Sequence, residues 1–494
     1  MSKDLRSFLA QVKEADAKGL LQETGYVEVG RRINPHLEIA LLREKLAHEG
    51  RFPVIFCPEV EGSTMPIVLN LDVSRELHGL SLGLDPSRWT DRDLQREYKK
   101  RLDERKPTKR VPASRAPVKE VIIKGADVDL ARLPIPQSAV PQAGKYITPG
   151  CMICRDPETG TLNVGVYRHQ VKGKNLLGAM INPLHDAAPI AWRYAQMGKP
   201  MEVAIVLGHH PAVGTAALAR GSLGDFSELD VAGGILGEPL EVVQGETVEL
   251  DVPAAAEIII EGVIDDPRPS STDGPFPEWT HYGRGNKPAY LIRVTAITMR
   301  HDAIYHDLVT TDRGRGGWGG YNTIRTFNAV KLAVPTVRQI RLWLGITWVQ
   351  ITKRVEGEGK LAAFAAMTAE EHNQIIVVVD DDIDLWSERD LGLALSRRLV
   401  GDRGIDIISR ITSDHLNPTS YNENRDPGIE LGPMGSRVLI DATRPLNLQW
   451  HTRITPENRF ESLWDTMTLD DFKLSRPARQ AREAVAAGNR GGRR

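Results

Sequence analysis

Hydrophobic and polar residues change their spacing along this chain, and the changes divide it into regions. In residues 3–22, Leu5, Phe8, Leu9 and Val12 fall on one face at helical spacing, which predicts an amphipathic helix. Short apolar runs containing proline predict strands in the same region. We expect further helices at 36–49 and 91–103, and strands at 51–58 and 65–70.

The pattern becomes β-like after Val118. Short runs of β-branched and aromatic residues are separated by Gly and Pro, which favours a barrel or sandwich over a parallel sheet. A single helix is predicted at 187–197, where Pro189 is tolerated in the first turn. The expected strands lie near 121–123, 165–168, 203–207, 240–243, 257–260 and 290–298.

Helix and strand patterns alternate again over residues 323–450. The unbroken β-branched run at 375–380 predicts a strand buried on both faces, and 438–441 predicts another. Ser387 with Asp390 resembles a capping box opening a helix to about Leu399. The end of the chain, from Asp470, has a helical pattern with basic residues, and we interpret it as an arm that packs on a partner subunit or as a frayed tail.

These patterns predict a multidomain α+β and α/β chain with a central split β-barrel. The chain has 494 residues, and two to four domains are expected for that length. Our proposed boundaries are an N-terminal α/β region at 1–117, a barrel at 118–312, an α/β domain at 313–450 and an arm at 451–494.

Composition and charge argue against a nucleic-acid-binding, membrane or secreted protein. The formal net charge of −2 supplies no overall field to attract nucleic acid or an anionic membrane. No apolar run approaches the roughly 18 residues that span a bilayer, and the N-terminus is charged too early for a secretory signal, so we expect a cytoplasmic protein. The basic, proline-rich residues 104–117 are interpreted as a linker rather than a nucleic-acid tail.

Three cysteines, Cys57, Cys151 and Cys154, are too few for a disulfide framework. Cys151 and Cys154 form a CxxC pair, which can be redox-active or half of a zinc site. Because no second pair follows, we predict that these thiols are packed in the core.

Two stretches hold most of the candidate chemistry. Asn163-Val-Gly-Val-Tyr-Arg168 places an amide and a guanidinium five residues apart on a predicted strand. Asp273-Gly-Pro-Phe-Pro-Glu278 is a Gly-Pro turn flanked by carboxylates. With His185 and Glu228, these residues supply oxygen and nitrogen ligands without thiolate, a set that favours Mn²⁺ or Mg²⁺ over structural zinc.

These residues resemble the signature of the UbiD family of decarboxylases, which use prenylated FMN. The similarity extends over roughly residues 115–450, through 377–384 and 441–445, in the family's order. The resemblance implies that Asn163, His185 and Glu228 bind a metal bridging to the flavin phosphate, often with K⁺ beside it. It also implies that Val166, Tyr167, Arg168, Ile181 and Leu184 lie along the flavin.

The reaction implied by the resemblance is the reversible, non-oxidative loss of CO₂ from a substrate bonded covalently to the modified flavin. Such a carbanion needs a cofactor as electron sink. Glu278 matches the family's proton donor, and Arg168 matches the arginine that pairs with both acids and orients the substrate carboxylate. Asp273 stands where many members have Glu, so its contact with Arg168 is expected to be direct, through a water, or through a shifted backbone.

Other residues have open interpretations. Trp318, in the glycine-rich loop after Asp312, is either a flat wall near the site or part of a plain turn. Arg397 either binds a second polar group of the substrate or lies on a helix surface. His281, Tyr282 and His301 are interpreted as structural groups.

The expected substrate is an aromatic or heteroaromatic acid such as a hydroxybenzoate, a pyrrole- or furan-carboxylate, or a phenazine-carboxylate. The resemblance also implies a homodimer or homohexamer and a UbiX-like flavin prenyltransferase that supplies the cofactor. The alternatives are a split-barrel FMN reductase, against which the lack of a nicotinamide-binding motif counts, and a non-catalytic subunit.

Overall fold

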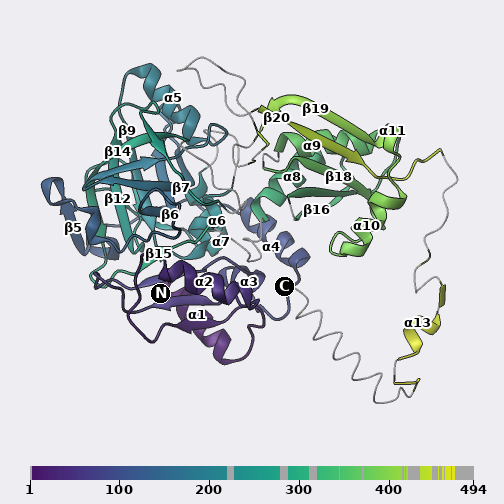
Figure 1. Ribbon diagram of the computed structural model, residues 1–494, viewed down its shortest axis with the longest axis horizontal. Coiled ribbons are helices and arrows are strands. Elements are labelled where there is room, and N and C mark those ends of the chain that lie inside the picture. Colours follow the sequence, from purple (N-terminus) through teal and green to yellow (C-terminus); the bar gives the residue numbers. More distant parts are fainter. Residues whose placement is uncertain are drawn as a thin grey trace. The chain divides into compact units, whose positions relative to one another are not determined.

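The computed structural model describes residues 3–219, 227–278, 287–310, 320–343, 345–369, 372–413, 417, 419–420, 434–447, 454, 459–460, 462–468 and 470–472. Two compact units are distinguished, Met1–Thr443 and Arg444–Arg494. Figure 1 shows the elements in chain order. The helices are α1 Leu5–Ala17, α2 Glu38–His48, α3 Arg75–Ser81, α4 Asp91–Asp103, α5 Ala187–Met197, α6 Pro211–Ala216, α7 Glu228–Leu236, α8 Gly320–Ala333, α9 Glu358–Ala369, α10 Glu388–Arg397, α11 Gly401–Gly404 and α13 Ser462–Thr466.

The strands fall into four sheets among the described residues. Their bounds are β1 Tyr26–Glu28, β2 Val54–Cys57, β3 Ile67–Leu69, β4 Lys109–Arg110, β5 Val121–Lys124, β6 Tyr146–Arg155, β7 Leu162–Gly173, β8 Leu176–Ala179, β9 Met201–Leu207, β10 Glu241–Gln244, β11 Asp251–Pro253, β12 Ile258–Ile264, β13 Ser271–Asp273, β14 Lys287–Met299, β15 Tyr305–Asp307, β16 Val337–Trp343, β17 Ile346–Ile351, β18 Ile375–Asp380, β19 Ile405–Thr412 and β20 Met434–Asp441.

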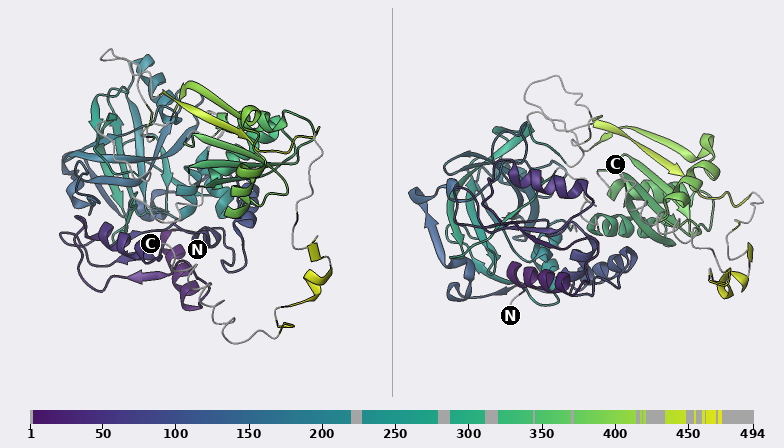
Figure 2. Two further views of the ribbon diagram at one scale, coloured as in Figure 1. Left: turned by 45° about the vertical axis from the view of Figure 1, so that its right-hand side comes forward. Right: turned by 60° about the horizontal axis from the view of Figure 1, so that its bottom comes forward.

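The central sheet closes into a six-stranded antiparallel barrel. Strands run in the order β12-β9-β6-β7-β8-β14, and β12 pairs again with β14. Neighbouring residues on one strand face different cores: Ile258 and Ile260 of β12 pack in one hydrophobic cluster and Ile259 in the other. Figures 1 and 2 show these strands curling back on themselves. The predicted barrel is therefore confirmed.

The sheet of the N-terminal region includes one strand, β15, that follows the barrel strands in the sequence. Its order is β1-β2-β3-β15, with Tyr305 of β15 opposite Ile67 of β3. Helix α1 begins where the Asp4 carboxylate accepts a hydrogen bond from the Ser7 amide and the Ser7 hydroxyl completes the capping box. The helix buries the apolar face that its spacing predicted.

The C-terminal α/β part contains the sheet β16-β17-β18-β20-β19. In β18, Ile376 and Val378 pack in the core formed with α8 and α9, whereas Val377 and Val379 pack with Leu391 of α10 on the other face. This two-sided burial is what the β-branched run predicts. Ser387 caps α10 by accepting from the Asp390 amide, but Asp390 itself accepts from Asp384.

Residues 104–117, expected to be a linker, are partly built into the fold. Strand β4 pairs in parallel with β10, and Arg110 forms an ion pair with Asp251 at 2.8 Å. Val111 and Ala116 are buried. Acidic residues of β10 and β11 thus pair with basic residues of this segment: Glu241 with Lys109 and Arg115, and Asp251 with Arg110.

Candidate active site

Arg168 of β7 is held between two carboxylates. Its Nε and Nη2 both donate to Asp273 Oδ2, at 2.9 and 2.6 Å, and its Nη1 pairs with Glu278 Oε1. The guanidinium carbon lies 4.6 Å from the centroid of the Phe276 ring. We call Arg168, Asp273 and Glu278 the clamp. The structure answers the open question about Asp273, because its contact with Arg168 is direct.

Strand pairing brings the clamp together from distant segments. Asp273 ends β13 opposite Lys287 of β14, β14 pairs with β8, and Ala179 of β8 lies opposite His169 of β7. Gly274 then turns the chain with φ +96°, a left-handed conformation that favours glycine. The turn thereby continues to Glu278, whose carboxylate reaches the same guanidinium from the other side.

The two carboxylates of the clamp are almost inaccessible to solvent. Asp273 is 0% exposed and Glu278 6% exposed. Buried carboxylates are costly unless they are paired and hydrogen-bonded, and here one guanidinium serves both. Two anions share one cation, so a proton on either acid leaves a balanced ion pair. The arrangement can orient a carboxylate ligand and exchange a proton beside it.

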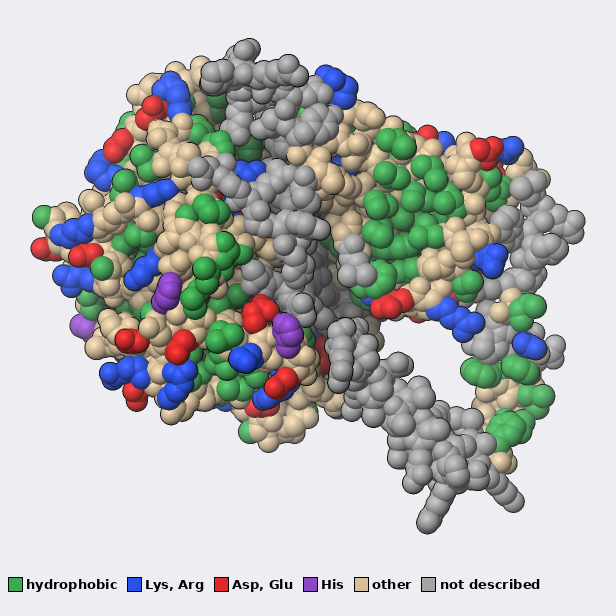
Figure 3. Space-filling view, in the orientation of Figure 1, with side chains coloured by type: hydrophobic (Ala, Val, Ile, Leu, Met, Phe, Trp, Pro, Cys, Tyr) green, Lys and Arg blue, Asp and Glu red, His purple; other side chains and the backbone are tan. Residues whose placement is uncertain are grey.

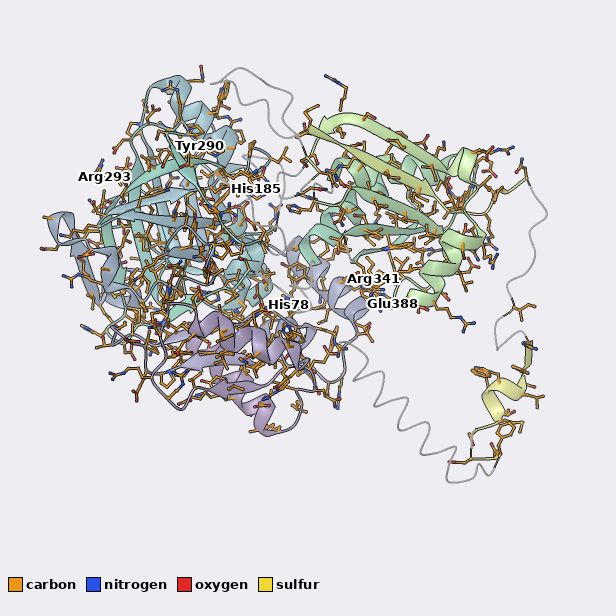
Figure 4. All side chains as sticks on the ribbon, in the orientation of Figure 1. His78, His185, Tyr290, Arg293, Arg341 and Glu388 are labelled. Atoms are coloured by element: carbon orange, nitrogen blue, oxygen red, sulfur yellow. The ribbon has the colours of Figure 1, made fainter. Side chains whose placement is uncertain are left out.

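Each predicted metal ligand lies on β7 or next to it. The Glu228 carboxylate, at the start of α7, accepts a hydrogen bond from the Val164 amide at 2.8 Å. The Asn163 amide nitrogen donates to Cys154 Sγ at 3.8 Å, leaving its oxygen for another partner. The His185 ring lies 5.7 Å from the Tyr167 ring, and Figure 4 labels His185 in the barrel region.

The electrostatics of Glu228 fit a cation ligand. The pKa of Glu228 is raised to about 8, mainly by burial and to a smaller extent by the nearby Asp186. A buried acid beside another acid is a poor arrangement without a positive charge, so the donor set of amide, imidazole and carboxylate suits a divalent ion. The described residues hold no group of three or more His, Cys, Asp or Glu that could hold a metal ion.

The remaining predicted residues lie in different surroundings. Tyr167 and Ile181 are buried in the barrel core, whereas Val166 and Leu184 are half-buried. Arg397 is exposed at the end of α10, and the neighbouring buried Arg398 pairs with Asp380 and Asp382. His301 is exposed. The expectations for Trp318, His281 and Tyr282 fall outside the described residues.

The cysteines are packed, as predicted. All three are free and buried. Cys154 belongs to the same core as Met152, and Cys151 to the core on the other side of β6. Since the two thiols of the CxxC pair face opposite sides of one strand, they do not form a redox pair.

The sequence did not indicate Tyr146, the first residue of β6. Its hydroxyl accepts a hydrogen bond from the Gly274 amide at 2.9 Å, directly beside the clamp. Pro149 and Gly150 interrupt the strand pattern there, although the apolar run 151–154 that follows was a usable signal.

A β-barrel that holds an arginine between two nearly buried carboxylates can bind the carboxylate of a ligand and place an acid beside it. Two sequence profiles of one family match, described as the 3-octaprenyl-4-hydroxybenzoate carboxy-lyase Rift-related domain at residues 109–313 and the C-terminal domain of the same carboxy-lyase at 318–442. The chain belongs to this family, the UbiD family, and is a UbiD-class carboxy-lyase.

Named relatives agree with the family. The anhydromevalonate phosphate decarboxylase of Methanosarcina mazei is 31% identical over 87% of this chain and 96% of its own length. An evolved dimeric form of the UbiD-class enzyme HmfF from Pelotomaculum thermopropionicum, in complex with prFMN, is 30% identical, with a TM-score of 0.77 over 95% of this chain and 100% of that chain. The closed form of Sedimentibacter hydroxybenzoicus vanillic acid decarboxylase is 25% identical, with a TM-score of 0.82 over 94% and 99%.

Among the described residues, no helix is long and apolar enough to cross a membrane.

Proposed function

We propose that this carboxy-lyase removes CO₂ reversibly from an aromatic or heteroaromatic acid with prenylated FMN as cofactor. The observation that carries the proposal is the buried clamp, in which Arg168 contacts both Asp273 and Glu278. The flavin is supported by the solved relative that contains prFMN. Family membership favours this chemistry over the flavin-reductase and non-catalytic alternatives.

In this proposal Asn163, His185 and Glu228 would hold Mn²⁺ or Mg²⁺, with K⁺ as a second ion, and the metal would help to bind the phosphate of the cofactor. The burial of Glu228, which is 3% exposed, supports this role, because a bound cation would balance its charge. Val166, Tyr167, Ile181 and Leu184 would contact the flavin. When bound, the cofactor supplies the electron sink that amino-acid side chains lack.

The clamp residues bind the substrate carboxylate and transfer the proton. Arg168 orients the substrate carboxylate through charge-assisted hydrogen bonds. Glu278 delivers the proton that replaces CO₂, and burial excludes the water that would otherwise compete for it. Asp273, bound to two nitrogens of Arg168, keeps the guanidinium in place while the protonation of Glu278 alternates.

The test is co-expression with a flavin prenyltransferase, followed by a screen of aromatic acids for CO₂ release. Glu278→Gln is expected to abolish turnover and retain the flavin spectrum. Glu358→Gln is a matched control, because Glu358 is equally buried but lies on α9 of the α/β part. Undiminished CO₂ release by the Glu278 variant refutes the proposed proton donor.

The metal site is tested separately. Glu228→Gln is expected to lower the manganese content of purified protein measured by elemental analysis, because it removes the only formal charge of the proposed ligand set. An unchanged metal content contradicts the assignment.

A second substrate class is a phosphorylated aliphatic acid. The observation favouring it is the anhydromevalonate phosphate decarboxylase that matches most of the chain. The screen therefore includes a phosphorylated enoic acid beside hydroxybenzoates and furan- and pyrrole-carboxylates. Turnover of the phosphorylated acid alone replaces the aromatic assignment.

We also propose a homo-oligomer, dimeric or hexameric, and a cytoplasmic location. Figure 3 shows a broad hydrophobic area over the α/β part of the chain. Ile407 is 65% exposed on the edge strand β19, and Leu361 and Phe364 are exposed on α9. Exposed apolar area of this kind is typical of a subunit interface. Sedimentation of the full chain measures the oligomeric state.

A further inference from the structure

Tyr146 connects the Asp-Gly-Pro turn to the wall of the barrel. It begins β6, is 1% exposed, and its hydroxyl accepts a hydrogen bond from the Gly274 amide at 2.9 Å. Gly274 directly follows Asp273, so this bond fixes the backbone next to the acid. The Tyr146 ring also lies 4.7 Å from the Phe276 ring, measured between centroids.

Phe276 links the same tyrosine to the cation. The Arg168 guanidinium lies over its ring at 4.6 Å, a distance typical of a cation–π contact. Tyr146, Phe276 and Arg168 therefore contact one another in this order, with the two rings tilted by 53°, and the Asp273 carboxylate pairs with the guanidinium at the end of the series. One aromatic side chain contacts the turn through its hydroxyl and its ring at once.

The position of the Asp273 carboxylate depends strongly on the backbone. An aspartate has a single methylene, so its carboxylate cannot compensate by rotation for a displaced Cα. A main-chain anchor of the turn is the Ala143 amide, which donates to the Pro275 carbonyl at 2.8 Å on the far side of Gly274. The Tyr146 hydroxyl is nearer to the acid.

The hydroxyl and the carboxylate also interact electrostatically. Burial raises the pKa of Tyr146, and the negative charge of the Asp273 carboxylate contributes to this rise. A hydroxyl that accepts from an amide keeps its own proton for donation. Asp273 Oδ1 is buried without a hydrogen-bond partner among the described residues and is the acceptor available in this direction.

We infer that Tyr146 is a positioning residue of the carboxy-lyase site: it holds Asp273 at the distance at which both nitrogens of Arg168 bind one carboxylate oxygen. The expected effect of Tyr146 on kcat rests on the proposed function. Its expected effect on the distance between Arg168 and Asp273 does not. Tyr146 lies outside the clamp and acts through Asp273.

The test removes the hydroxyl and keeps the ring. Tyr146→Phe is expected to lower kcat about tenfold, equivalent to about 1.4 kcal/mol of transition-state stabilisation, with unchanged flavin content. Tyr305→Phe is the matched control, since Tyr305 is equally buried and its hydroxyl has no hydrogen-bond partner among the described residues. Similar losses of kcat in the two variants overturn the inference.

A second arm separates positioning from general packing. Asp273→Glu lengthens the acid, so its carboxylate can reach Arg168 from a displaced backbone. In that background the effect of Tyr146→Phe on kcat is expected to fall below twofold, because coupled residues give non-additive effects. An equal effect in both backgrounds means that Tyr146 does not act through Asp273.

A third arm needs no turnover. In a crystal structure of Tyr146→Phe, the Arg168 Nη2 to Asp273 Oδ2 separation, 2.6 Å in the parent chain, is expected to exceed 3.5 Å. An unchanged separation overturns the inference. If the parent chain releases no CO₂ from any acid, the proposed function fails, and this separation alone decides the role of Tyr146.

Discussion

Removing the clamp cation isolates the cost of burying its acids. In Arg168→Gln, the Asp273 carboxylate keeps its 0% exposed position but loses both of its N–H donors. Breaking a buried ion pair by deleting one partner costs about 3–5 kcal/mol, because the remaining charge stays desolvated. For a folding unit of 150–250 residues this corresponds to a Tm lowered by roughly 6–20 °C.

The assay is thermal unfolding of the variants at neutral pH, read by circular dichroism. Arg168→Gln combined with Asp273→Asn removes the more deeply buried of the two carboxylates that lose their cation, so this double variant is expected to recover at least half of the lost Tm. Glu278→Gln alone is expected to change the Tm by less than about 2 °C, since a neutral amide still pairs with the guanidinium. A loss below about 1 kcal/mol in the single variant, or no recovery in the double variant, refutes the reasoning.

Three further predictions concern parts of the fold outside the clamp. Gly234→Ala is expected to cost about 1–3 kcal/mol, because a Cβ there would lie 2.4 Å from the Arg101 carbonyl, whereas Gly214→Ala meets nothing within 4 Å and is expected to be neutral or stabilising; urea unfolding compares them. The three buried thiols are expected to resist iodoacetamide at pH 8 until the protein is unfolded, as mass spectrometry can check, because burial raises the pKa of each to about 12. Burial lowers the pKa of His209 to about 4, so the unfolded chain binds the proton first and stability falls as pH drops from about 6.5 to 4, by about 3 kcal/mol; His209→Gln is expected to flatten this part of the stability profile, and an identical profile contradicts the assignment.

Sequence patterns predicted the elements whose burial is regular. The helix at 187–197 and the strand at 375–380 have the predicted bounds. In each, the positions of the apolar residues in the sequence match the positions that are buried in the fold. The antiparallel barrel follows from short strands between turns, since closure satisfies the edges of such a sheet.

Helix α7 was not predicted because its sequence lacks a polar face. Nearly all of Glu228–Leu236 is buried, so there is no amphipathic period to detect. Gly233 and Gly234 also disfavour a helix intrinsically. Their lack of a side chain is required by tertiary contact, since a Cβ on either would lie within 2.7 Å of a backbone oxygen of the segment 101–106. Packing against a distant segment overrides the local preference here.

Candidate residues were easier to predict than their geometry. Arg168 and Asp273 lie 105 positions apart, and no local pattern relates them. Their contact depends on three successive strand pairings, β13 with β14, β14 with β8, and β8 with β7. A one-residue slip in any of these pairings turns the affected side chains to the opposite face. Such a slip at β13 would set Thr272 in place of Asp273, leaving the guanidinium with one acid instead of two. The charge balance of the site therefore depends on the strand register of the barrel. A variant that shifts the register is expected to lose the pairing of Arg168 with two acids.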